Sequence, residues 1–209
     1  MIVLFTDFGV RDPYVGQVKA HLAEHAPGQQ VVDLLHEAPD FNPHAGAHLL
    51  AAFAPGFPPG SVFLAVVDPG VGTLRGAVVA MAGGRWFVGP DNGLLSIVAA
   101  RHSDTRLWRI HWQPEILSPT FHGRDLFAPI AADIARGEFP AAKLTQTDQL
   151  DVEFDAGDLA RVIYIDHYGN AWTGIRGVPK NARVSAAGES FRHSDSFGLV
   201  GKGEGFWFL

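Results

Sequence analysis

Residues 62–68 read VFLAVVD, a run that is apolar on both faces and is closed by the turn Asp68-Pro69-Gly70. A strand covered on both faces belongs inside a largely parallel sheet. Similar short runs bounded by Gly, Pro or Asn lie at Ile2–Thr6, Val31–His36, Ala77–Met81, Arg85–Val88 and Leu107–His111. The first 140 residues therefore contain the strands of one large sheet.

Helical patterns alternate with these strands. The pairs Asp12-Pro13 and Asn42-Pro43 each predict an N-cap followed by proline in the first turn of a helix. Asn92 and Gly123 precede two more helices, which we expect over residues 94–100 and 125–136. Alternating strands and helices predict an α/β fold, with an N-terminal α/β/α layered domain over residues 1–140 and a mostly parallel sheet.

The pattern changes after Pro140. Residues 141–158 are polar and acidic, and we expect a linker there. Residues 159–209 show strand-like runs and no helical stripe, which predicts a small C-terminal β domain. These runs are Arg161–Ile165, Ala171–Ile175, Arg183–Ala186 and Gly205–Leu209. Because the sequence stops inside the last apolar run, we expect this domain to be truncated.

The composition excludes several classes of protein. The 209 residues carry 16 Lys and Arg against 22 Asp and Glu, for a net charge of −6, and no basic run supplies a face for nucleic acid. No apolar stretch reaches the roughly 20 residues of a membrane span. Cysteine is absent, which excludes disulfides, thiolate metal sites and a cysteine nucleophile. These features favour a cytoplasmic protein with neither nucleic acid nor membrane as partner.

Polar residues follow two of the predicted strands, at the sheet edge where open α/β folds bind ligands. Asp7 follows the first strand, beside a glycine turn, where a carboxylate suits the two hydroxyls of a ribose; taken alone, a capping or loop-closing role explains it better. Asp68 is followed seven residues later by Arg75. That pair either surrounds a small polar ligand or braces a turn, and the two readings are equally supported.

Histidines raise a metal-dependent alternative. His44 and His48 stand four residues apart, which is metal-ligand spacing on a helix, although no Glu follows His44 as a metalloprotease signature requires. Together with Asp7 and His36 they make a metal-dependent hydrolase an alternative hypothesis. Two further segments, TFHGRD at 120–125 and DHYGN at 166–170, gather polar side chains at predicted element ends.

Six segments, taken in order, resemble a single family. They are TDFG (6–9), DPYVG (12–16), VDPGVG (67–72) with Arg75, GPDNGLL (89–95), TFHGRD (120–125) and DHYGN (166–170). Together they resemble the S-adenosyl-L-methionine hydroxide adenosyltransferases, the adenosine-forming hydrolases of S-adenosyl-L-methionine (SAM), which are relatives of fluorinase and chlorinase. The resemblance implies a β-barrel-like C-terminal domain, a homotrimer, and a small-molecule substrate held at the subunit interface.

The resemblance also implies the reaction and the residues that perform it. The reaction is SAM plus water to adenosine and L-methionine, with SAM as substrate and with no cofactor or metal. Asp68, Arg75 and His122 resemble the water-activating triad. The implied substrate-binding residues are Asp7 on the ribose hydroxyls with Phe8, Asp12 and Tyr14 nearby, Asp166 on the methionine amino group, and Asn170 and Trp172 near the adenine.

Two features separate the chain from the halogenating relatives. Those enzymes carry a halide-coordinating serine where this sequence has Gly123, and they have an insertion between the segments that match Arg75 and Pro90. Hydrolysis is therefore favoured over halide transfer. The family pattern also continues past Leu209 with an Asn-Ser-x-Gly stretch, which puts binding through the β domain in doubt. A non-catalytic module that binds adenosine or SAM is the second alternative.

Overall fold

Seven strands form the central sheet, in the order β2-β1-β3-β5-β4-β6-β7. Their bounds are β1 (Ile2–Thr6), β2 (Val31–Leu35), β3 (Val62–Val66), β4 (Ala77–Ala82), β5 (Arg85–Pro90), β6 (Arg106–Ile110) and β7 (Leu144–Thr147). Strands β2, β1, β3 and β5 pair in parallel, whereas β4 is antiparallel to β5 and β6, and β7 is antiparallel to β6. Five of the seven strands thus run in one direction, which confirms the predicted mostly parallel sheet.

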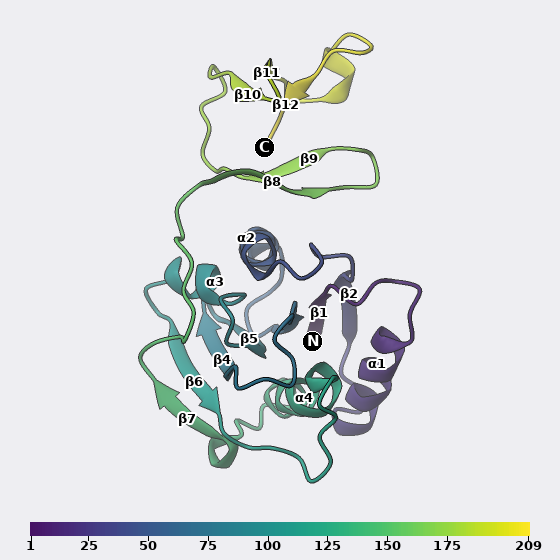
Figure 1. The fold of residues 1–209 in the computed structure, drawn as a ribbon, viewed down its shortest axis with the longest axis vertical. Coiled ribbons are helices and arrows are strands. Elements are labelled where there is room, and N and C mark those ends of the chain that lie inside the picture. The colour runs from purple at the N-terminus through teal and green to yellow at the C-terminus, as the bar shows by residue number, and fades with distance from the viewer. The chain divides into compact units, whose positions relative to one another are not determined.

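The computed structural model describes residues 1–209 as two compact units. The first comprises Met1–Gly157 and Arg161–Gly174, and the second comprises Asp158–Ala160 and Ile175–Leu209. In the first unit, α1 (Tyr14–His25) and α4 (Ala128–Ala135) cover one face of the sheet, while α2 (Pro43–Phe53) and α3 (Ser96–Ala100) cover the other (Figure 1). The predicted α/β/α layering is confirmed.

The two proline-containing helix starts differ. Asn42 caps α2 as predicted, because its side chain accepts a hydrogen bond from the backbone N–H of Ala45 at 3.1 Å. The predicted cap at Asp12 is wrong, since Pro13 itself occupies the cap position of α1 and no side chain bonds to the first turn. The Asp12 carboxylate is therefore available for another role.

The core of the first unit lies between the sheet and its helices. Phe5, Phe63, Phe87 and Phe127 are fully buried, and the rings of Phe63 and Phe87 stack at 4.9 Å between centroids. Each such ring stabilises the fold by about 1.5–3 kcal/mol relative to an exposed side chain. This packing anchors β1, β3 and β5 in the sheet.

The segment expected to be a linker is partly built into the first unit. After a 3₁₀ turn at Ala141–Lys143, residues 144–147 form the edge strand β7. Farther along, the backbone N–H of Asp151 donates to Asp91 at 3.0 Å, and that of Phe154 donates to Ser96 Oγ at 3.1 Å. The stretch LTQT has too little apolar alternation to be recognised as a strand from sequence.

The C-terminal part consists of strands, as predicted. Strands β8 (Leu159–Ile165) and β9 (Ala171–Gly174) pair with each other, and β10 (Val184–Ala186), β11 (Glu189–His193) and β12 (Phe206–Trp207) form a three-stranded sheet. These strands do not close into a barrel. Strand β11 was not predicted, because its sequence ESFRH carries one apolar residue among polar ones.

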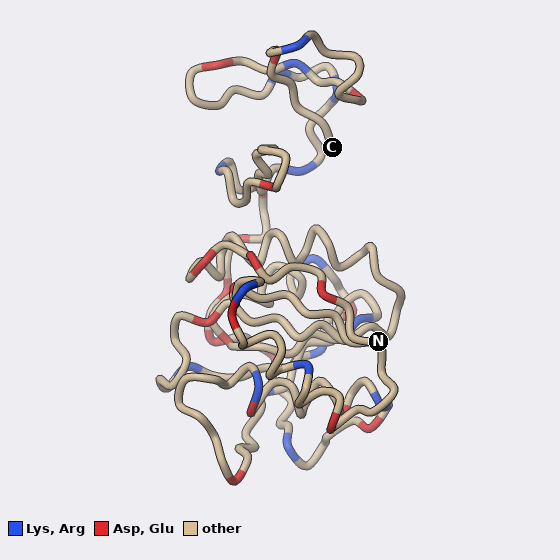
Figure 2. The backbone as a smooth tube through the Cα atoms, turned by 90° about the vertical axis from the view of Figure 1, so that its right-hand side faces the viewer, with Lys and Arg blue, Asp and Glu red and all other residues tan.

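Charge is distributed without a dominant basic surface. Figure 2 shows the Lys and Arg positions scattered along the chain and interspersed with Asp and Glu. None of the helices combines the length and the apolar character that a bilayer-spanning segment needs.

Candidate functional site

A cavity of about 1050 Å³ opens at the carboxyl ends of β1 and β3. Strand β1 lies between β2 and β3, so the chain leaves it toward one side and returns on the other, and this switch point is where α/β sheets bind ligands. Asp7 and Asp68 follow these two strands and both line the cavity, as do Phe8, Asp12, Tyr14, Phe41, Phe121, His122 and Asp166. The two carboxylates that follow these strands therefore line the same cavity.

Three of the predicted residues form one hydrogen-bonded network. Arg75 Nε donates to both carboxylate oxygens of Asp68, at 2.9 and 3.0 Å, and Nη2 of Arg75 also bonds to Asp68 Oδ2. The same Nη2 lies 3.0 Å from Nδ1 of His122. The side chains of Asp68 and Arg75 are only 5% and 10% exposed, so this ion pair is shielded from solvent.

The network depends on close contact between two loops. A Cβ added to Gly72 would lie 2.3 Å from the carbonyl oxygen of Pro119, and Gly72 has a φ of +76°. Only glycine therefore lets the loop that follows Asp68 approach the segment leading to His122. A π-helical turn, η2 (Gly123–Phe127), then follows His122, and the ring of Phe127 lies 5.2 Å beneath the Arg75 guanidinium.

The contact with Arg75 fixes the protonation of His122. A guanidinium can only donate hydrogen bonds, so Nδ1 of His122 must be the acceptor, and a neutral ring then carries its proton on Nε2. Burial, and next the Arg75 charge, lower the pKa of His122 below its ordinary 6.5. His122 is therefore a neutral side chain at pH 7 with one N–H free to donate.

Arg75 itself does not line the cavity, whereas Asp68 and His122 do. The guanidinium lies behind them and also donates through Nη1 to the carbonyl of Gly76 at 3.0 Å. Arg75 is thus held by three neighbours in one orientation, from which it neutralises Asp68 and orients His122.

Asp7 lies in the same cavity on the β1 side. Its Oδ2 accepts a hydrogen bond from the backbone N–H of Phe41 at 3.2 Å. Burial raises the pKa of the Asp7 carboxyl, and the charges of Asp40 and Asp68 act in the same direction. Asp7 has spare acceptor capacity for a polar ligand, and a ligand that donates to it favours its charged form.

An aromatic wall stands beside these acids. The rings of Phe8, Tyr14 and Phe121 contact one another with centroids 5.5–6.1 Å apart. Gly123 adjoins this wall, because an added Cβ would lie 2.9 Å from Cζ of Phe8. The rings meet edge to face, at 56–86° between their planes, and together offer an apolar surface to an aromatic or ribosyl ligand.

The predicted residues of the β8–β9 hairpin are organised around one carboxylate. Asp166 accepts hydrogen bonds from the backbone of Tyr168 and Asn170, from Asn170 Nδ2 at 2.7 Å, and from Trp172 Nε1 at 3.3 Å. These donors lower the pKa of Asp166, the Asn170 amide most. Asp166 lines the cavity, but Asn170 and Trp172 do not, and the Trp172 ring packs on Phe53.

The residues of the metal-dependent alternative do not come together. His36 lies 2.9 Å from Thr6 Oγ1 through Nδ1 and 3.1 Å from Asp33 through Nε2, so both ring nitrogens serve the β1–β2 region. His44 stacks on Phe154 at 4.4 Å. Asp7, His36 and His44 form no cluster with metal-ligand spacing, so the geometry does not support that alternative.

Phe121 and Phe41 are among the cavity residues that were not assigned a role from sequence. Phe121 completes the aromatic wall, and its place beside His122 in the segment TFHGRD was the available signal. Phe41 is 76% exposed and adopts a φ of +54°, which is rare for a side chain of its size. No local pattern in the sequence marks such a conformation.

Comparisons with known proteins agree with this geometry. The family model for the SAM hydroxide adenosyltransferase N-terminal domain matches residues 2–145, and the model for the C-terminal domain of the same family matches residues 160–209. An (R)-S-adenosyl-L-methionine hydrolase from Thermus thermophilus is 38% identical over 97% of this chain and 85% of its own length. A fluorinase from Actinopolyspora mzabensis is 28% identical over 84% of this chain and 71% of its own.

A solved structure has the same fold. The crystal structure of an uncharacterized conserved protein from Thermotoga maritima superposes with a TM-score of 0.86 at 32% sequence identity. The match covers 98% of this chain and 86% of that protein.

Proposed function

Because the chain belongs to the SAM hydroxide adenosyltransferase family, we propose that it hydrolyses S-adenosyl-L-methionine to adenosine and L-methionine. The observation that carries this proposal is the shielded network of Asp68, Arg75 and His122, which presents a carboxylate and an imidazole to the same cavity as Asp7. In this proposal the network holds the water molecule that attacks the substrate.

The cavity supplies groups for each part of the substrate. Asp7 accepts hydrogen bonds from the two ribose hydroxyls, with Asp12 nearby, and the aromatic wall of Phe8, Tyr14 and Phe121 contacts the nucleoside. Asp166 pairs with the methionine amino group. Asn170 and Trp172 bond to Asp166 and stabilise that carboxylate, and the family resemblance assigns them to the adenine. An anionic cavity also suits a substrate whose sulfonium is positive.

The reaction is a displacement at C5′ of the ribose. The water oxygen forms a bond to C5′ while the C5′–S bond breaks. The electron pair of the C5′–S bond stays with sulfur, which leaves as a neutral thioether. The leaving group therefore needs no acid. One proton must leave the attacking water, so the residues around the nucleophile decide the rate. Charge is neutralised as the bond forms, which favours a site from which bulk water is excluded.

The network divides this task between its members. Asp68 accepts the proton of the water, because a carboxylate retains acceptor capacity beside the Arg75 bonds. His122 donates from Nε2 to the water oxygen and so orients its lone pair toward C5′. Arg75 holds both side chains in position and acts as a positioning residue. No step in this scheme requires a metal or a redox cofactor.

The family resemblance supports a proposal for the assembly, and the composition supports one for the location. We propose a homotrimer in which the site lies at the subunit interface, in the cytoplasm. The acidic composition and the absence of cysteine support that location.

The test is direct. Purified protein is incubated with SAM, and adenosine and methionine are quantified by chromatography against time. Equal amounts of the two products are expected, with an Asp68→Asn variant as control that retains SAM binding and loses turnover. SAM binding by the wild-type protein without release of adenosine would instead identify a non-catalytic binding module.

A further inference from the structure

The C-terminal half of α1 carries a second cluster of chemically active side chains. Its sequence is His21-Leu22-Ala23-Glu24-His25. Residues three and four apart share one face of a helix, so the two imidazoles and the carboxylate project to the same side. The spacing His-x-x-Glu-His is that of a zinc-binding helix motif, in which the two histidines are ligands. Nothing in the proposed reaction uses these residues.

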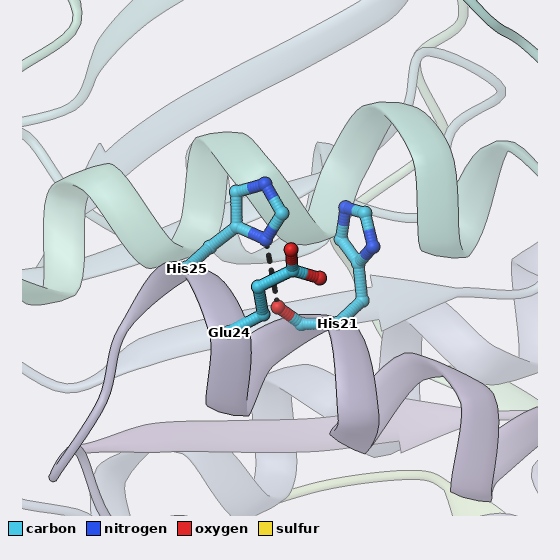
Figure 3. Close-up of side chains that lie close together, drawn as sticks. All are labelled: His21, Glu24 and His25. Carbon is cyan, nitrogen blue, oxygen red and sulfur yellow. Dashed lines mark hydrogen bonds between the residues drawn. The ribbon is translucent and has the colours of Figure 1, made fainter.

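The geometry brings one ligand atom from each residue close together. One such atom from each of His21, Glu24 and His25 lies within 4.8 Å of the others, and Figure 3 shows the three side chains extending from the same stretch of α1. The rings of His21 and His25 stack with centroids 4.1 Å apart and planes 24° apart. An imidazole nitrogen binds zinc at about 2.0–2.1 Å, in the plane of its ring. Both rings must therefore rotate out of the stack to share one ion.

One histidine is already prepared as a ligand. Nδ1 of His25 lies 2.9 Å from the carbonyl oxygen of His21, and a carbonyl can only accept, so the proton of a neutral His25 ring is on Nδ1. Nε2 then presents a free lone pair. A hydrogen bond from the other ring nitrogen to a backbone carbonyl commonly orients a histidine that binds a metal.

The surroundings offer room and a suitable charge. His21 and His25 line a cavity of about 240 Å³ together with Glu115, Asp125 and Asp133. The nearby cations are paired: Lys143 bonds to Asp133 at 2.7 Å, Arg136 bonds to Asp133 and Glu138, and Arg124 bonds to Asp125 at 2.6 Å. The cavity therefore admits water molecules to complete a coordination shell, and no uncompensated positive charge opposes a cation.

We propose that His21, Glu24 and His25 form a binding site for a divalent transition-metal cation, with zinc as its best match. Imidazole nitrogens and a carboxylate are ligands that zinc prefers, and the open positions are filled by water. His21 lies seven residues after Tyr14, about 10 Å along the helix axis, and none of the three ligands lines the substrate cavity. The site is separate from the hydrolytic centre and does not depend on the proposed function.

The experiment is a calorimetric titration of zinc chloride into full-length protein that has been stripped with chelator and freed of any purification tag. We expect one equivalent to bind the wild-type protein. His21→Gln and His25→Gln should each weaken binding by about tenfold or more, and Glu24→Gln should weaken it less. His102→Gln, which removes a histidine from the loop before β6, is the matched control and should bind zinc as the wild type does.

A second measurement separates site loss from misfolding. Zinc should raise the Tm of the wild type and of His102→Gln, because the ion binds the helical conformation, and should leave the Tm of His21→Gln/His25→Gln unchanged. The Tm values without zinc show whether each variant is folded. The proposal is overturned if the wild type binds no more zinc than the double variant, or if His102→Gln loses binding equally.

Discussion

Nη2 of Arg75 lies 3.0 Å from Nδ1 of His122, although the two residues are 47 positions apart in the chain. Because the guanidinium donates this bond, the imidazole is neutral with its remaining proton on Nε2. Arg75 also holds Asp68 through both carboxylate oxygens. The three side chains therefore behave as one unit, with two of them facing the substrate cavity.

Substitutions within this unit should not be additive. Asp68→Ala, Arg75→Ala and His122→Ala should each lower kcat by about 10²–10⁴-fold, while the affinity for SAM changes little, because these residues act on the water and not on the substrate. Asp68→Ala/His122→Ala should cost little more than the worse single variant. The measurements are kcat, SAM affinity and Tm for each variant. A His122→Ala enzyme with full turnover would contradict the proposed roles.

Turnover should decrease in mildly acidic solution. Protonation of His122 at Nδ1 removes the acceptor for Arg75 and places two cations side by side. Since the pKa of His122 is lowered, kcat should be constant above pH 6.5 and decrease as the pH falls through the lower value of the folded enzyme. Folding stability should also decrease below pH 6.5, because the unfolded chain binds the proton first.

His122→Asn provides the control for this pH dependence. Its amide oxygen can accept from Arg75 without titrating, so the residual activity should lack the acidic limb. If the decrease of kcat at acidic pH persists unchanged in His122→Asn, another group causes it. Asp7, whose pKa is raised, is the next candidate.

Removal of the Asp7 carboxylate should weaken substrate binding. Asp7→Ala deletes the acceptor for two ribose hydroxyls, and the loss of two charge-assisted hydrogen bonds corresponds to about 2–4 kcal/mol, or roughly 30- to 700-fold in affinity. Calorimetry with SAM measures this change. Asp148→Ala, which removes a carboxylate outside the cavity lining, is the matched control. If Asp7→Ala and the wild type bind SAM with equal affinity, Asp7 does not contact the substrate and serves only as the acceptor for the Phe41 backbone.

The loop contact at Gly72 should be required for both stability and catalysis. Gly72→Ala places an alanine in the left-handed region of backbone conformation and adds a Cβ that would lie 2.3 Å from the Pro119 oxygen. Gly28→Ala is a matched control, because Gly28 has a φ of +81° and open space around an added Cβ. Both variants should lose about 1–3 kcal/mol from the backbone conformation. Only Gly72→Ala should lose more and also lower kcat, as measured by chemical denaturation and product release.

Regular, buried elements were the part of the fold that sequence predicted well. The apolar run at Ile2–Thr6 coincides with β1, and the start of α2 at Asn42-Pro43 is confirmed, because burial on both faces and a proline after a cap are local features. Strands β7 and β11 were missed because their polar sequences carry no such pattern. The cap at Asp12 was mispredicted because Pro13, with φ −74° and ψ −7°, occupies the cap position, and the fixed φ of proline suits the first helical position equally well.

The site also contains some features that the sequence predicts and others that depend on tertiary contacts. That Asp7 and Asp68 face one cavity follows from the rule for strand ends in parallel sheets. The bond between Arg75 and His122 could not be derived from spacing, since it depends on tertiary contact between the loops at Gly72 and Pro119. Only the family resemblance placed those residues together. The position of Phe41 follows from a backbone conformation that its sequence neighbours do not indicate.

The central claim is that water attacks C5′ of SAM in this cavity, and hydrolysis in ¹⁸O-labelled water tests it most directly. The products are separated and analysed by mass spectrometry. One ¹⁸O atom per molecule should appear in the 5′-hydroxyl of adenosine, with unlabelled methionine in equal amount. Label in the methionine-derived product, or adenosine without label, would contradict attack of water at C5′.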